Sequence, residues 1–249
     1  MSEPAASTAA PARARAAVGA GAAVRAIAGV TWTRLWRGRA VWIAAGIAAL
    51  PYLLAAIGKA ASRGGPHPAV GQAEVLSLAV LVMAVLPPLL VASAVAEELE
   101  DKTAAYLWSR PIARWTVLVG KLVVLLPLAA ALVAGGTAAA LRTLGPVDGG
   151  AGLTTISAAL AAGASALGLC AAGISSLAPR QGTAVTIGYI ILIDLPLGVL
   201  PAAIANLSIT HHVDTLTGRD GVSAAPMIGL AALALAWGGL ALWRIRTAE

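Results

Sequence analysis

The chain has 249 residues, of which 59% are hydrophobic and only 11% are charged, and its mean hydropathy is +0.86. This composition excludes an ordinary soluble domain and predicts one contiguous, all-α polytopic membrane domain. The formal net charge of +6 does not indicate a nucleic-acid partner, because the basic residues flank apolar runs instead of forming one basic face. Only one cysteine, Cys170, is present, so no intrachain disulfide can form.

Two segments precede the first apolar run. Residues 1–21 are mainly Ala, Pro, Ser and Gly, which predicts a disordered cytoplasmic tail, with a cleaved signal peptide as the alternative. Residues 25–39 combine four arginines with Trp32 and Trp36, a pattern typical of an amphipathic helix in the lipid headgroup region. The alternative for 25–39 is a positively charged anchor of the first span.

Six apolar segments follow within residues 22–249, and together they predict a six-helix transmembrane domain, since about 20 apolar residues cross a bilayer core. They are Val41–Ile57, Val75–Ala96, Thr116–Leu141, Leu153–Ala178, Thr183–Pro201 and Met227–Trp243. Several contain proline, which membrane helices tolerate as a kink. Gly163, Gly168 and Gly173 mark the fourth segment for close contact with other helices. Five tryptophans are interpreted as interfacial anchors of the spans: Trp42, Trp108, Trp115, Trp237 and Trp243.

The distribution of Lys and Arg predicts the orientation, because cytoplasmic loops carry the excess of positive charge. With the amino terminus inside, 13 basic residues face the cytoplasm and four face outward. The outward four are Lys59, Arg63, Arg142 and Arg219. Both termini and residues 97–115 are therefore expected on the cytoplasmic side of the inner (plasma) membrane.

The densest charge cluster lies between the second and third spans, in residues 97–115. Its acidic members come first and its basic members last, which suits a short surface helix that Pro111 would end. The candidate site residues are Glu97, Glu98, Glu100, Asp101, Lys102, Thr103, Arg110 and Arg114. A charged loop that only sets the topology is the alternative interpretation.

This segment resembles the permeases of ABC-2-type transporters. Glu98, Thr103, the run Ser109-Arg110-Pro111-Ile112-Ala113-Arg114, and Gly120-Lys121 carry the resemblance, although Lys102 replaces the commoner glycine before the threonine. The branch it resembles includes the nitrous-oxide-reductase maturation permease. The resemblance implies an interfacial elbow helix at 25–39 and a coupling helix at 97–115 that docks on a separate ATPase. It also implies a second permease copy, identical or paralogous, that packs on the first and fifth spans.

No phosphate-binding Gly-x-x-x-x-Gly-Lys-Ser/Thr loop occurs in the sequence. We therefore expect no enzyme activity and no cofactor in this chain, with ATP and Mg on the partner ATPase. The apolar lining of the spans favours a lipid or amphiphile as the exported substrate. Two alternatives are a membrane scaffold or sensor component that recruits a cytoplasmic partner, and an intramembrane hydrolase built on Glu97-Glu98. The hydrolase is disfavoured because His211 and His212 fall on the opposite face.

Asp194 is the only charge between residues 181 and 201, about 18 Å into the fifth span. With Pro196 it predicts a broken helix over 194–206, in which the carboxylate caps a helix start or lines the exit path. A protonated Asp packed on a neighbouring helix is the alternative. Residues 202–225 are interpreted as an outer loop that leaves His211, His212 and Asp214 solvated, and no metal site is expected.

Thiol labelling tests the orientation in intact cells, after Cys170→Ala removes the native thiol. Cysteines introduced as Ser2→Cys, Ser109→Cys and Thr247→Cys should resist a membrane-impermeant maleimide, and Ser223→Cys should react, because only position 223 is outside. Labelling of position 109 from outside would overturn the orientation.

Overall fold

The computed structural model describes residues 19–62, 69–100, 113–145, 152–201, 203–218 and 223–247, and all regular secondary structure in these ranges is helical. The α-helices are α1 (Ala20–Arg37), α2 (Ala40–Ala48), α3 (Leu50–Ala61), α4 (Gln72–Glu100), α6 (Arg114–Leu144), α7 (Leu153–Leu177), α8 (Gly182–Tyr189), α9 (Leu195–Val199), α10 (Ile209–Thr217) and α11 (Ala224–Thr247). The 3₁₀-helices are η1 (Pro179–Gln181) and η3 (Ala203–Leu207), and the π-helix is η2 (Ile190–Asp194).

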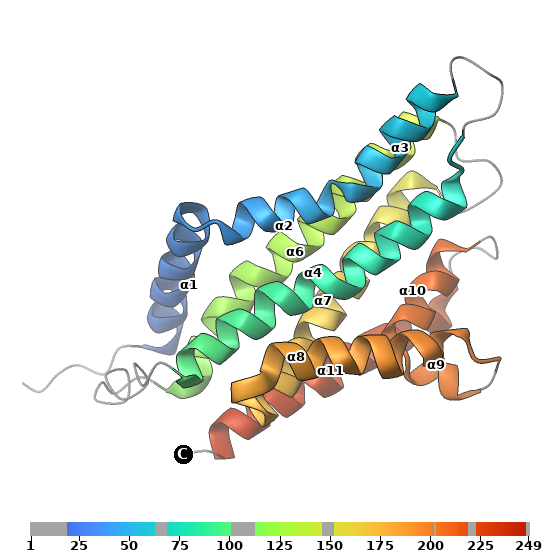
Figure 1. Ribbon diagram of the computed structural model, residues 1–249. Helices are drawn as coiled ribbons and strands as arrows, with labels where there is room; N and C mark the ends of the chain where they lie inside the picture. The colour runs from blue at the N-terminus through green and yellow to red at the C-terminus, as the bar shows by residue number, and fades with distance from the viewer. Residues whose placement is uncertain are drawn as a thin grey trace, which may run out of the picture.

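Five helical segments in the described residues are long and apolar enough to cross a membrane: α4, α6, α7, the run Pro179–Val199, and α11. The pair α2 and α3 makes a sixth if its two helices, which meet at 40°, form one span. These segments run side by side along one direction (Figure 1). The expectation of an all-α polytopic membrane protein is confirmed.

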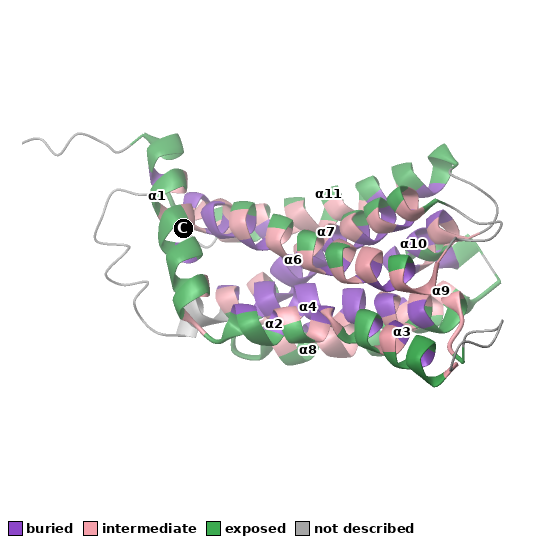
Figure 2. Cartoon of the chain, turned by 90° about the horizontal axis from the view of Figure 1, so that it is seen from above, coloured by how far each residue is buried: buried purple, intermediate pink, exposed green. Residues whose placement is uncertain are grey.

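Helix α1 runs across the direction of the spans, as both views show (Figures 1 and 2). It packs mainly on α6 and is not among the helices that could span a membrane. It begins at Ala20, so residues 20 and 21, assigned above to the tail, belong to this helix. Trp32 and Trp36 on α1 are exposed, with their rings edge to face at 5.7 Å, while the headgroup location of α1 stays a prediction.

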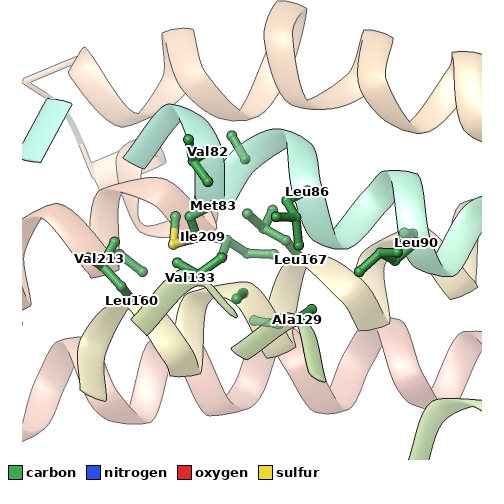
Figure 3. Packing of buried hydrophobic residues seen from close by; sticks show 14 of the residues in the cluster. Val82, Met83, Leu86, Leu90, Ala129, Val133, Leu160, Leu167, Ile209 and Val213 are labelled. Atoms are coloured by element: carbon green, nitrogen blue, oxygen red, sulfur yellow. The ribbon is translucent and has the colours of Figure 1, made fainter. Parts of the chain in front are cut away.

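Helices α4 and α7 form the centre of the bundle. Each packs on α6 and α8, and α7 also packs on α10 and α11. The residues between them are fully buried and include Met83, Leu86, Leu160 and Leu167 (Figure 3). Figure 2 shows buried residues along the middle of the bundle and exposed ones along its flanks.

Glycines let the helices approach α7 closely, as expected for the fourth span. A Cβ on Gly163 would lie 2.5 Å from Met83 Sδ, and one on Gly173 would lie 2.8 Å from Trp237 Cε3. Trp237 also contacts Tyr189, with ring centroids 5.5 Å apart. Trp237 therefore packs its ring on α7 and on Tyr189, while its role as an interfacial anchor stays a prediction.

The break between α2 and α3 fits against a glycine of α6. Pro51 is in the first turn of α3 and has no N–H for a bond across the break. The carbonyl group of Ala48 at the end of α2 points at Gly136, where a Cβ would collide with the carbonyl oxygen and lie 3.0 Å from the carbonyl carbon. The bend thus needs a residue without a side chain at position 136.

Gly136→Ala should lower the stability of the purified protein by about 1–3 kcal/mol, because the methyl group must displace backbone atoms of Ala48. Gly135→Ala is the matched control, since a Cβ added there would have nothing within 4 Å and alanine favours the helix. Thermal unfolding followed by tryptophan fluorescence in detergent should show a lower Tm for the first variant only. Equal Tm values for the two variants would contradict the close contact.

Candidate functional site

The acidic residues of the charged segment continue the second span. Glu97, Glu98 and Glu100 lie in the last turn of α4, although their side chains lie outside the described part of the structure. Arg114 is the first residue of α6. The remaining candidate residues also lie outside the described residues: Asp101, Lys102, Thr103 and Arg110. The structure thus places the two ends of the segment but does not test the proposed coupling helix.

The Gly-Lys pair that follows this segment joins three helices. Gly120 lies where α1 crosses α6: a Cβ there would be 2.9 Å from Ile27 Cβ and 3.1 Å from the Val24 carbonyl oxygen. The next residue, Lys121, is buried, and its Nζ donates a hydrogen bond to the carbonyl oxygen of Ala94 on α4. Glycine therefore allows α1 to approach, and lysine links α6 to α4 six residues before Glu100. This role of the pair cannot be read from the motif, because it depends on α1 and α4.

A further contact brings the end of α11 to the same place. The Arg246 guanidinium lies 5.9 Å from the ring centroid of Trp115, in the first turn of α6. This cation–π distance links the last turn of the chain's last described helix to the start of the third span. Consequently α1, α4, α6 and α11 meet at one end of the bundle (Figure 1).

At the opposite end of the bundle, Asp194 caps the start of α10. The N–H groups of Ile209 and Thr210 donate to its two carboxylate oxygens at 2.8 and 3.1 Å, and the Asp194 side chain is fully buried. The Ser208 hydroxyl oxygen accepts from the His211 N–H at 3.0 Å. All three N–H groups in the first residues of α10 therefore have side-chain acceptors.

The backbone of Asp194 also holds α10 in place. Its carbonyl oxygen lies 2.9 Å from the Ser208 hydroxyl and 3.3 Å from the Thr210 hydroxyl, which donate to it. The preceding residues form the π-helix η2, and Pro196 stands in the first turn of α9. The span ends at Val199, and the chain returns through η3 to the level of Asp194. Of the interpretations weighed for Asp194, the observed geometry is that of a helix cap.

The interpretation of residues 202–225 as a solvated outer loop is wrong. Most of this stretch is helical, and Ile209 and Val213 of α10 insert into the core beside α4 and α7 (Figure 3). Leu216, also on α10, belongs to the same core. His212 is only 5% exposed, and its Nε2 lies 2.9 Å from the Asn206 carbonyl oxygen. The spacing of these apolar residues after Ser208, a favoured N-cap residue, was the signal that could have revealed the helix.

Among the cavities between the described helices, two are relevant to function. One of about 640 Å³ separates α7 from α11 and is lined mostly by alanine and leucine. The other, of about 440 Å³, lies between the start of α4 and the pair α9 and α10, and its lining includes His211 and Asp214. Within the described residues, no group of three His, Cys, Asp or Glu side chains could hold a metal ion.

These features define the class of protein. It is a helical membrane domain with a charged segment after α4 at one end of the bundle and a broken span, at Asp194, at the opposite end. The family described as ABC-2 family transporter protein matches residues 32–194, about two thirds of the chain. The chain therefore belongs to this family and is a permease subunit of an ABC transporter, which works with an ABC ATPase. No curated protein matches the chain.

Asp194→Ala should destabilise the protein by about 2–6 kcal/mol, because two buried N–H groups lose their acceptors at about 1–3 kcal/mol each. Hydrogen exchange should rise first at the amides of Ile209 and Thr210, and the Tm should fall. Asp214→Asn is the control: it changes an exposed carboxylate on the same helix and should leave the Tm within about 1 °C. Unchanged exchange at the start of α10 in Asp194→Ala would contradict the cap.

Proposed function

We propose that this chain is the permease subunit of an ABC exporter that moves a lipid or amphiphile by alternating access. A separate ATPase chain binds ATP and Mg and drives transport, and the permease pairs with a second copy of itself or with a paralogue. Residues 97–115, with the eight charged or polar side chains named above, are the coupling segment. The resemblance to the nitrous-oxide-reductase maturation branch remains a hypothesis about the nearest relatives.

The observation that carries this proposal is the continuity of α4. This helix runs 29 residues from Gln72 to Glu100, through Pro87 and Pro88, and ends in the acidic residues. It packs on α2, α3, α6, α7 and α8, so it contacts both halves of the bundle. Displacement of its acidic end by an ATPase would therefore be transmitted to most of the membrane helices.

The membrane orientation is supported by the common location of the charged ends. The start of α6, the end of α4 and the end of α11 gather at one end of the bundle (Figure 1). Arg114 and Lys121 at the start of α6 and Arg244 and Arg246 at the end of α11 place four basic residues there. We therefore assign this end of the bundle to the cytoplasmic side of the plasma membrane, with both termini there.

Exposed apolar side chains support pairing with a second permease. They lie on the first and fifth spans, where the resemblance implies contact between permeases, and include Trp42, Ile43, Ile57, Leu192 and Val199. In a monomer they would face only lipid. A lipid or amphiphile substrate is supported by the apolar cavity between α7 and α11.

Charge reversal at the end of α4 tests the coupling. Glu98→Lys should reduce co-purification of the ATPase from native membranes at least tenfold, or leave its ATP hydrolysis uncoupled from transport in proteoliposomes. The reason is that a positive charge replaces a negative charge at the proposed docking surface. Glu74→Lys is the matched control, since it reverses a charge at the other end of the same helix. Both variants should insert and unfold like the wild type.

Two outcomes would count against the proposal. Normal assembly and normal transport in Glu98→Lys would exclude a docking role for this residue. Stable binding of the ATPase without any transported compound, in the wild type, would favour the scaffold or sensor alternative.

A further inference from the structure

The cavity at the outer end of the bundle has two chemically different sides. Its volume is about 440 Å³, and it lies between the first turns of α4 and the outer faces of α9 and α10. Apolar side chains of α4 and α9 line one part, among them Leu76, Val80 and Leu195. Polar side chains, mainly from α10, line the rest. A ligand that fits both parts must itself be amphipathic.

The hydroxyl groups of the cavity already use their protons. Ser77 Oγ donates to the Ala73 carbonyl oxygen at 2.9 Å, and Thr217 Oγ1 donates to the Asp214 carbonyl oxygen at 3.1 Å. Thr210 Oγ1 donates either to the Asp194 carbonyl oxygen or to Ser208 Oγ. Since each hydroxyl has only one proton, these groups can offer a ligand only acceptor lone pairs.

The two remaining polar groups are also acceptors. His211 Nδ1 lies 3.2 Å from the Gly198 carbonyl oxygen, and because a carbonyl oxygen only accepts, Nδ1 must carry the proton. With the Nδ1 proton assigned in this way, Nε2 is the acceptor of the ring in its neutral form. Asp214 adds an exposed carboxylate, which accepts and is negatively charged. None of the described residues that line the cavity is a lysine or an arginine.

We propose that this outer cavity binds the primary ammonium headgroup of an amphiphile, with the first part of its alkyl chain against α4 and α9. A primary ammonium has three N–H donors and a positive charge, which match a lining of acceptors and one carboxylate. A quaternary ammonium has no N–H donor, and among the described side chains of the lining a phosphate or carboxylate headgroup would meet only acceptors. The inference rests on the proposed function, whose substrate class it makes specific.

Two sources present a primary ammonium: a free alkylamine, and a lipid with an ethanolamine headgroup. In the lipid, the two methylene groups of ethanolamine would take the place of the first part of the alkyl chain. The probe that distinguishes them is dodecylamine carrying a diazirine near the amine, added to the full chain in nanodiscs of phosphatidylcholine and phosphatidylglycerol. After photolysis, labelled peptides are mapped and quantified. Competition by unlabelled dodecylamine or by added phosphatidylethanolamine then identifies which source binds more tightly.

Labelling should concentrate on the peptides that contain α4 residues 73–80 and α10. Asp214→Asn should reduce it about tenfold, because the ammonium loses a charge-assisted hydrogen bond. Glu74→Gln, which removes a carboxylate from α4 outside the cavity lining, should stay within twofold of the wild type. Dodecyltrimethylammonium should compete at least tenfold more weakly than dodecylamine. Labelling by a diazirine derivative of dodecanol should be the same in Asp214→Asn as in the wild type.

Three results would overturn the inference: equal labelling by the amine and the alcohol, equal loss in Glu74→Gln and Asp214→Asn, or labelling confined to other helices. The binding assay contains no ATPase, so Glu98→Lys should be labelled like the wild type. Specific labelling together with normal transport in Glu98→Lys would reject the coupling proposal and keep the site. Loss of coupling in Glu98→Lys without specific labelling by the amine would reject the ammonium site and keep the coupling proposal.

Discussion

A helix that begins in the interior of a helical bundle leaves its first backbone N–H groups without water to bind, and α10 meets that constraint through Asp194 of the fifth span. The carboxylate accepts from two N–H groups at the start of α10, and Ser208 accepts from the third. Because no unsatisfied donor remains in this first turn, α10 can pack its apolar face between α4 and α7. The position of α10 in the bundle therefore depends on this cap.

Helix α4 connects the two ends of the molecule that carry polar chemistry. Its last turn holds the acidic residues of the charged segment, and its first turns line the outer cavity. Ser77 and Glu98 are 21 residues apart, which is roughly 32 Å along the helix. Lys121 links α6 to α4 near the acidic end, and α10 contacts α4 near the cavity. A displacement at one end of α4 therefore has a direct mechanical connection to the other.

Close packing around small residues replaces the hydrophobic effect that would hold a soluble bundle together, since lipid is as apolar as the helix surfaces. Gly163 lies against α10 and Met83, Gly173 lies against Trp237, and Gly136 lies against the bend of the first span. Gly120 does the same where α1 crosses α6. Each glycine lies where two helices approach so closely that a Cβ would collide, so these positions set which helices are neighbours.

The sequence by itself determined the all-α membrane class, the approximate spans and a break near Asp194, because each depends on local composition: apolar length, and a charge and prolines inside a span. It also led to the family through the residues around Glu98 and Gly120. It did not reveal that α10 is a buried helix, or that Trp237 packs inside the bundle. Those facts depend on partners distant in the chain, since the acceptors for α10 come from a carboxylate 15 residues earlier and Trp237 meets a glycine of α7. Only the tertiary structure brings such groups together, because the local sequence of a helix does not indicate which distant helices will pack against it.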